Sequence, residues 1–130
     1  MSVSVAAKAW MTQFAQAVRQ QDFDAGSALF SDAVLGFGTR ATRVLDLVQL
    51  QIEQWQFIWP NTTGFEFQLE AAVIQGQDDL LWIACPWFSW GVGADGNTFP
   101  RSGRATVVLN RQAGVWLAVH SHFSLDPSAL

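Results

Sequence analysis

The spacing of hydrophobic and polar residues changes near Pro60. Before Pro60, apolar residues recur every three to four positions, which is the period of a helix with one buried face. After Pro60, apolar and polar residues alternate, which is the period of a half-buried strand. The pattern therefore predicts an α+β fold, with N-terminal helices packed on one face of an antiparallel sheet.

The first half contains three predicted helices and one short strand. The first helix spans about Ser4–Gln20, and a short second helix runs from Asp22, a residue type favoured at the N-cap, to Phe30. A strand is expected at 33–37. The longest helix runs from Thr42 to Trp59, because Pro60 stops it. Its buried stripe is expected to comprise Leu45, Val48, Ile52, Trp55 and Trp59.

Four strands are predicted after Pro60. The first is a half-buried strand at 65–74, and the second, at 80–90, is apolar on both faces. A loop at 91–100 precedes the final hairpin, whose strands are 104–110 and 115–125. Strict alternation along this hairpin places Ala105, Val107, Leu109, Val115, Leu117, Val119, Ser121 and Phe123 on the face toward the helices. It places Arg104, Thr106, Val108, Asn110, Trp116, Ala118, His120, His122 and Ser124 on the outer face.

Composition excludes several classes of protein. The 130 residues are 50% hydrophobic and 14% charged, which excludes intrinsic disorder and predicts one domain with a large core. A net charge of −4 gives no basic footprint for nucleic acid. The single cysteine, Cys85, excludes an intramolecular disulfide. No segment has the length of a membrane span or the pattern of a secretory signal, so we expect a cytoplasmic protein without a membrane partner.

The pair His120 and His122 is the most metal-like motif in the chain. Two imidazoles on one face of a strand can share a metal ion, but a site needs a third ligand and the sequence has no other histidine. A carboxylate ligand such as Glu66 or Glu70 has no supporting pattern. We therefore expect the pair to have a structural role, within the sheet or at a subunit interface, with no metal and no cofactor.

The final hairpin carries a recognisable motif. The segment from Gly103 to Leu109, the Gly114-Val115-Trp116 turn and the His120-Ser121-His122-Phe123-Ser124 run resemble the C-terminal hairpin of the SnoaL-like, nuclear transport factor 2-like superfamily. The nearest type is the association domain of calcium/calmodulin-dependent kinase II. Phe37-Gly38-Thr39 and the segment from Gly76 to Asp79 also stand where this superfamily has similar residues, so the resemblance extends over nearly the whole chain.

The resemblance implies a single domain over residues 1–130, in which about three helices close a cone-shaped, curved antiparallel sheet. It implies a cavity between the helices and the sheet, and a homodimer or higher oligomer formed through the outer sheet face. The residues expected to line the cavity are Trp87, Val107, Phe123, Ser121, Phe67 and Cys85. Those expected at the dimer interface are Trp82, Phe88, Trp90, Trp116, His120, His122 and Arg104.

The kinase association domain lines its cavity with arginines that attract carboxylates. At the corresponding positions this chain has Val107, Phe123 and Trp87, so the resemblance implies a hydrophobic cavity and does not imply binding of an anion. Arg40 is the remaining cation that could reach the mouth of the cavity, although a surface position is the simpler expectation.

Catalytic motifs are weak in this sequence. Superfamily enzymes such as ketosteroid isomerase use a tyrosine, and this chain has none. The aspartates lie mostly at predicted caps and turns, whereas Asp46 and Glu53 could act as a general base only if their helix face turned inward. Cys85 is better explained as a small buried residue than as a nucleophile. We therefore expect a protein that binds a small, mainly apolar molecule; an assembly module without a ligand and an isomerase- or cyclase-type enzyme are the alternatives.

Overall fold

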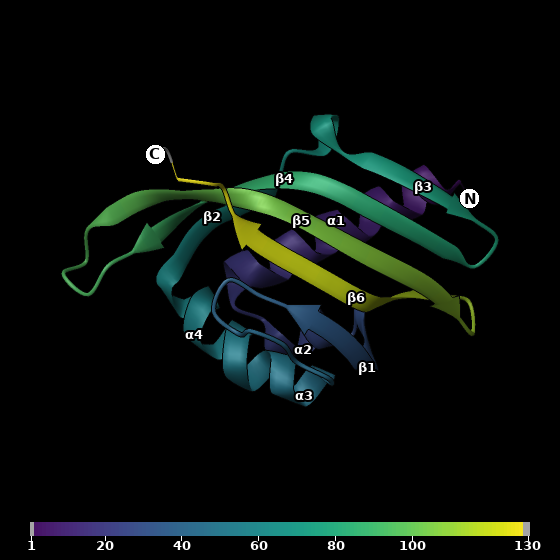
Figure 1. The fold of residues 1–130 in the computed structure, drawn as a ribbon, viewed down its shortest axis with the longest axis horizontal. Helices are drawn as coiled ribbons and strands as arrows, with labels where there is room; N and C mark the ends of the chain where they lie inside the picture. The colour runs from purple at the N-terminus through teal and green to yellow at the C-terminus, as the bar shows by residue number, and fades with distance from the viewer. Residues whose placement is uncertain (1, 129–130) are drawn as a thin grey trace.

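A curved sheet arches over a layer of helices in the computed structural model, which describes residues 2–128 (Figure 1). Five strands lie side by side in the order β1 (Phe30–Phe37), β6 (Val115–Leu125), β5 (Thr98–Gln112), β4 (Leu80–Val92) and β2 (Thr62–Phe67), and β3 (Val73–Gln77) pairs with the Leu80–Ala84 part of β4. The helices cover the concave face, and the opposite face carries no helix (Figure 1). The predicted α+β class and curved sheet are therefore confirmed.

Helices α1 (Val3–Gln20) and α2 (Phe23–Ser27) begin at side-chain caps. Ser2 accepts a hydrogen bond from the Val5 amide, and Asp22 accepts one from the Ala25 amide. Each cap satisfies one of the amides that a helix N-terminus leaves unpaired. Helix α2 ends at Ser27, earlier than predicted, because Phe30 begins strand β1.

The third helix begins at Leu47 because the Asp46 carboxylate caps it through the Gln49 amide. It consists of α3 (Leu47–Leu50), a π-helical turn (Gln51–Trp55), α4 (Gln56–Ile58) and a final 3₁₀ turn (Trp59–Asn61).

The buried stripe of this helix differs from the predicted one. Trp55 and Trp59 are buried as expected, but Leu45, Val48 and Ile52 are exposed, with Val48 reaching 64%. The prediction assumed an uninterrupted α-helix from Thr42. The residues actually buried are Leu47, Leu50, Gln54, Trp55 and Trp59.

The strands are β1 (Phe30–Phe37), β2 (Thr62–Phe67), β3 (Val73–Gln77), β4 (Leu80–Val92), β5 (Thr98–Gln112) and β6 (Val115–Leu125). The single strand predicted at 65–74 is in fact two strands, because a 3₁₀ turn at Leu69–Ala71 interrupts it. Much of the predicted 91–100 loop also belongs to the paired ends of β4 and β5.

The sheet is antiparallel except at one edge. Strand β1 pairs with β6 in parallel, so the expectation of an entirely antiparallel sheet is wrong at this pair. The two strands come from opposite ends of the chain and no hairpin joins them. Alternation within each strand therefore could not fix their relative direction.

Because of a bulge in the last hairpin, the first residues of β6 lie on the opposite face from the one predicted. Val107 pairs with Ser121 and Val108 with His120, but Leu109 pairs with Ala118. The extra residue in β6 reverses the alternation before the bulge. Ala118, fully buried, and Trp116 consequently share the side of Leu109 rather than the outer face. Trp116 packs against the hydrophobic core.

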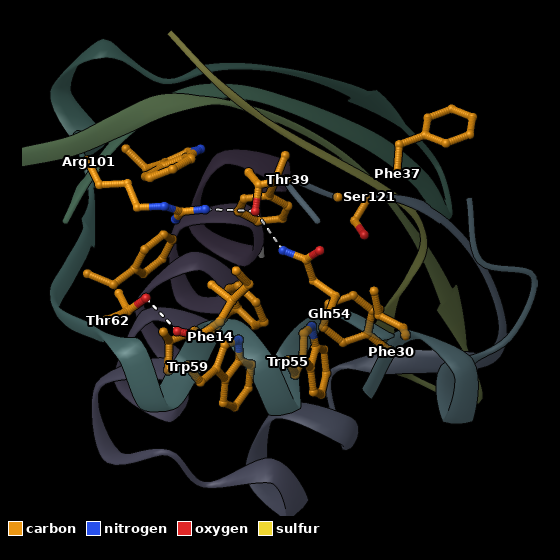
Figure 2. Close-up of a pocket in the computed structure, with 17 residues that line it drawn as sticks. Phe14, Phe30, Phe37, Thr39, Gln54, Trp55, Trp59, Thr62, Arg101 and Ser121 are labelled. Carbon is orange, nitrogen blue, oxygen red and sulfur yellow. Dashed lines mark hydrogen bonds between the residues drawn. The ribbon is translucent and has the colours of Figure 1, made fainter. Parts of the chain in front are cut away.

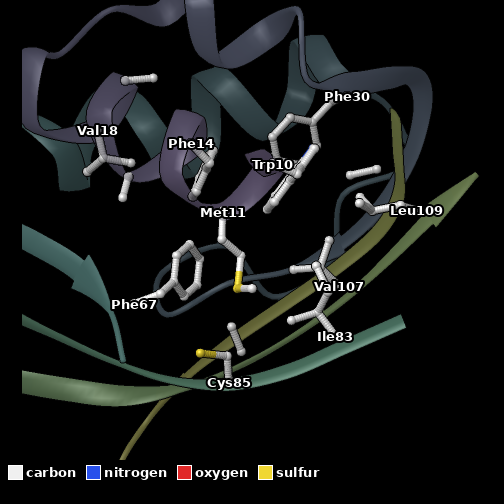
Figure 3. Packing of buried hydrophobic residues seen from close by; sticks show 14 of the residues in the cluster. Trp10, Met11, Phe14, Val18, Phe30, Phe67, Ile83, Cys85, Val107 and Leu109 are labelled. Carbon is white, nitrogen blue, oxygen red and sulfur yellow. The ribbon is translucent and has the colours of Figure 1, made fainter. Parts of the chain in front are cut away.

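The hydrophobic core lies between α1 and the middle of the sheet (Figure 3). Met11 of α1 is fully buried, and Ile83 and Leu109 face it from β4 and β5. Their burial removes three large apolar side chains from water, each stabilising the fold by about 1.5–3 kcal/mol. This core holds α1 against the middle of the sheet, and the position of α1 in turn fixes the residues at the other end of the concave face.

Candidate cavity site

A cavity lies beside this core, between the sheet and the third helix (Figure 2). Its volume is about 50 Å³ as traced by the centre of a water-sized sphere. Strands β1, β2, β4, β5 and β6 contribute to its lining, together with α1, the third helix and the loop after β1. The lining residues are Phe14, Val18, Phe30, Phe37, Gly38, Thr39, Leu50, Gln54, Trp55, Ile58, Trp59, Thr62, Phe65, Trp87, Arg101, Ser121 and Phe123.

Aromatic rings form most of the cavity wall. Trp55 and Trp59 of the third helix stack with ring centroids 4.5 Å apart. Phe14 of α1 contacts both of them and also approaches Phe123 of β6, with centroids 5.8 Å apart. Such contacting rings hold one another in place. The apolar wall of the cavity is therefore held in a fixed arrangement.

The π-helical turn supplies Gln54, whose buried side-chain amide lines the cavity and binds the loop after β1. Its Oε1 accepts hydrogen bonds from the amides of Arg40 and Ala41, at 2.9 and 2.8 Å. Its Nε2 donates to Thr39 Oγ1 at 2.8 Å. Gln54 thus clamps the loop after β1 against the helix, which explains why a polar residue is buried in this position.

Arg101 of β5 extends into the same cavity and is half-buried. One guanidinium nitrogen donates to Thr39 Oγ1 at 2.8 Å (Figure 2). The guanidinium carbon lies 5.6 Å from the centroid of the Trp87 ring, within the range of a cation–π contact. Burial lowers the pKa of Arg101, because an apolar surrounding disfavours the charged form.

The salt bridges formed within residues 2–128 join Arg104 to Asp126 and Arg111 to Asp79, so they give Arg101 no carboxylate partner. The described residues that line the cavity likewise include no aspartate, glutamate or histidine. The cavity therefore contains a cation without a neighbouring anion.

Trp87 of β4 presents a second unpaired group. Its side chain is only 2% exposed, and its indole Nε1–H has no hydrogen-bond partner among the described residues. Gly103 on the neighbouring strand provides the space for this ring. A Cβ at Gly103 would lie 2.6 Å from the Trp87 ring and 1.9 Å from the Ser124 carbonyl oxygen.

Three of the six residues predicted to line the cavity do line it: Trp87, Ser121 and Phe123. Val107 and Cys85 instead pack in the core (Figure 3). Phe67 also belongs to the core and borders a separate pocket next to Met11. Burial, followed by the negative charge of Glu70, raises the pKa of the Cys85 thiol to about 11, so it is protonated at neutral pH.

The prediction of a purely hydrophobic cavity is wrong at Arg101. Arg40 is exposed at the surface, as the simpler expectation had it, and its guanidinium carbon lies 3.5 Å from the centre of the Phe57 ring. Arg101 shares the alternation of Ala105 and Val107, but it precedes the strand that the sequence pattern predicts from Arg104 onward. Extending that alternation two residue pairs backwards would have identified it.

Neither candidate general base lines the cavity. Asp46 is exposed and caps α3. The Glu53 carbonyl oxygen accepts a hydrogen bond from Arg40 on the outside of the helix.

The outer face of the sheet is rich in apolar side chains. Trp82 and Trp90 of β4 are each 41% exposed, and Phe88 packs edge-on against Trp90. Arg104 lies on the same side of the neighbouring strand, exposed and near Asp126. These predicted interface residues, unlike Trp116, share one face.

His120 and His122 also lie on the outer face, where Phe37 contacts both rings. His120 Nδ1 is 2.8 Å from the Leu35 carbonyl oxygen of β1. Within residues 2–128, no cluster of three or more His, Cys, Asp or Glu side chains forms a metal site. No helix in this part of the chain is long and apolar enough to cross a membrane.

Comparison with known proteins identifies relatives by sequence and by fold. A sequence model of the SnoaL-like domain matches residues 7–127. A search of the curated proteins finds no match.

Three solved structures illustrate the similarity in fold. A nuclear transport factor 2-like superfamily protein from Salmonella enterica has a TM-score of 0.83 at 18% sequence identity. The alignment covers 98% of this chain and 94% of the Salmonella chain. A ketosteroid isomerase-like protein from Erwinia carotovora has a TM-score of 0.80 at 16% identity, covering 95% and 96%. A provisionally assigned calcium/calmodulin-dependent protein kinase II association domain from Xanthomonas campestris has a TM-score of 0.75 at 14% identity, covering 98% and 87%. The match of the SnoaL-like domain model to residues 7–127 confirms the predicted superfamily, and these structures share its fold.

Proposed function

The chain belongs to the SnoaL-like domain family, and we propose that it binds a small, mainly apolar molecule in the cavity between the sheet and the third helix, as a homodimer. The observation that carries this proposal is the aromatic-walled cavity itself. Concave sites with apolar walls and a few converging polar groups are typical ligand sites. Here the polar groups of Gln54, Thr39 and Arg101 meet at one side of such a wall.

The charges around the cavity favour binding over acid–base catalysis. Proton transfer needs a group that can accept a proton near neutral pH, usually an imidazole or carboxylate. The described lining residues contain neither, and Arg101 is their sole ionisable side chain. A half-buried guanidinium stays protonated at neutral pH and is suited to hold an acceptor rather than to remove a proton.

Native mass spectrometry tests the binding proposal. Protein purified without added ligand is expected to carry a reproducible extra mass, or to be stabilised in a thermal-shift assay by compact apolar compounds. Ser121→Leu fills the cavity and is expected to abolish both effects. Ser4→Leu makes the same substitution at an exposed position and should abolish neither. Absence of both effects in the wild type would contradict the proposal.

The homodimer is supported by the apolar outer face of the sheet. Trp82, Phe88 and Trp90 lie on one side of β4, and exposed apolar area of this kind commonly marks an interface. We expect Trp82→Glu to weaken self-association because it places a charge in that area. Val48→Glu, on the exposed side of the third helix, is the matched control. A wild-type mass equal to one chain in light scattering would contradict the dimer.

A second candidate function is supported by the small size of the cavity. Trp87, Phe65 and Phe123 occupy much of the concave end, with the Phe65 and Trp87 centroids 5.6 Å apart. A protein that serves as an assembly module needs the outer face but no open cavity. In that case Ser121→Leu would raise thermal stability without changing self-association or any bound mass.

A further inference from the structure

We propose that the cavity ligand is a compact carboxylate, with its anionic group held by the Arg101 guanidinium and the Trp87 indole N–H and its apolar body against the aromatic wall. This inference rests on the proposed function and adds the chemical class of the ligand. It departs from the sequence-based expectation, which implied no anion.

The first observation is that the polar groups at this end of the cavity have donors to spare. A guanidinium carries five N–H donors and no acceptor. The side-chain hydrogen bond that Arg101 makes within residues 2–128 is the one to Thr39. Thr39 Oγ1 already accepts two hydrogen bonds, from Arg101 and Gln54, so its own O–H is left to donate. The site is therefore complementary to a ligand that accepts hydrogen bonds.

The second observation is independent of charge. The Trp87 Nε1–H is buried without a partner, and leaving such a donor unpaired costs about 1–3 kcal/mol. Trp87 lines the same cavity and lies beside Arg101. An acceptor that reaches both side chains would satisfy both donors.

The identity of that acceptor follows from the unbalanced charge. A neutral carbonyl would accept a hydrogen bond but leave the half-buried cation uncompensated. A carboxylate has two oxygens, so one can accept from Arg101 and the other from Trp87, and it neutralises the charge. No described cavity residue supplies an anion that would compete with it.

The cavity volume limits the size of the ligand. The volume of about 50 Å³ corresponds to room for roughly four waters, or on the order of 120 Å³ of ligand. That space fits a carboxylate on a single ring. Larger polycyclic molecules would require the aromatic wall to move.

Paired titrations with benzoate and benzyl alcohol test the proposal, because these probes share the ring and differ in the anionic group. Calorimetry on the full chain is expected to show tighter binding of benzoate. Arg101→Met should weaken benzoate by about 10- to 100-fold, the range for a hydrogen bond to a charged group. It should leave benzyl alcohol nearly unchanged. Trp87→Phe, which keeps an aromatic ring, should weaken benzoate by about 3- to 10-fold.

The controls separate this inference from the proposed function. Arg43→Met removes the same charge at an exposed position and should leave benzoate binding intact. If benzyl alcohol binds as tightly as benzoate and Arg101→Met changes neither, the cavity binds ligands but the carboxylate assignment is overturned. If neither probe binds at millimolar concentration, both proposals fail. Circular dichroism of each variant shows that the loss of binding is not a loss of fold.

Discussion

The two ends of the concave sheet face are built from similar residues but are packed differently. At one end, Met11, Ile83 and Leu109 fill the space between α1 and the sheet. At the other end, larger side chains such as Trp87 and Phe123 leave a cavity, and polar groups border it. Protein interiors normally close such spaces. The cavity end therefore contains two destabilising features: among the described residues, Arg101 has no anionic partner and the Trp87 indole N–H has no acceptor.

The closed end should show the largest effect on stability. Leu109→Ala removes a fully buried side chain, and we expect it to lower the free energy of unfolding by about 3 kcal/mol. Ile58→Ala, at the cavity, should cost less than half as much, because Ile58 is partly exposed and already borders open space. Urea unfolding at one fixed protein concentration measures both. Equal losses would show that the two ends are packed alike.

Substitution of Gln54 should have the next largest effect on the free energy of unfolding, because this side chain holds the loop after β1 against the third helix. Gln54→Leu leaves the amides of Arg40 and Ala41 without their acceptor, and we expect a loss of about 1–3 kcal/mol. Gln56→Leu, exposed two residues away, is the control and should change stability little. Faster hydrogen exchange at Arg40 and Ala41 in Gln54→Leu alone would locate the effect. A stability loss without that change would contradict the clamp.

Arg101 should contribute little to stability despite its central position. Arg101→Met loses the hydrogen bond to Thr39 but also removes a desolvated charge that has no carboxylate partner within residues 2–128. These effects oppose one another, so we expect the free energy of unfolding to change by less than about 1 kcal/mol. A loss of several kcal/mol in urea unfolding would assign Arg101 to the structural framework instead.

The smallest effect is expected at Cys85, in the closed end. Because burial raises the pKa of its thiol to about 11, folded protein at pH 8 should react with a disulfide reagent far more slowly than protein in urea. The raised pKa also favours the folded state below about pH 9, the ordinary thiol value, and this contribution is lost as the pH rises toward 11. Rapid labelling of the folded protein at pH 8 would show that this end opens.

Periodicity predicted most of the elements, because each is governed by local alternation. It failed where the backbone departs from regular geometry. The bulge opposite Leu109 places Trp116 on the other face from the predicted one. The third helix contains a π-helical turn, and its buried residues include Gln54, which the predicted stripe did not. Neither irregularity has a signature in hydropathy, and the direction of β1 beside β6 depends on contacts between distant segments.

The candidate site was predicted in part for a related reason. Trp87 and Phe123 were identified because they stand where the resembling kinase association domain lines its cavity, and both lie on the apolar alternation of their strands. Arg101 was missed because a charged residue near a predicted loop is normally solvated. The long extension of β5 to Thr98 turned that loop into a strand and placed Arg101 on the inner face.

The indole N–H signal of Trp87 in a ¹⁵N spectrum tests the central claim most directly. Trp87→Phe identifies the signal among those of the seven tryptophans. Addition of benzoate is predicted to move the Trp87 signal downfield, because its N–H gains an acceptor, and Arg101→Met should suppress the shift. A Trp87 signal that stays in place while benzoate saturates the protein would show that the ligand does not occupy this cavity.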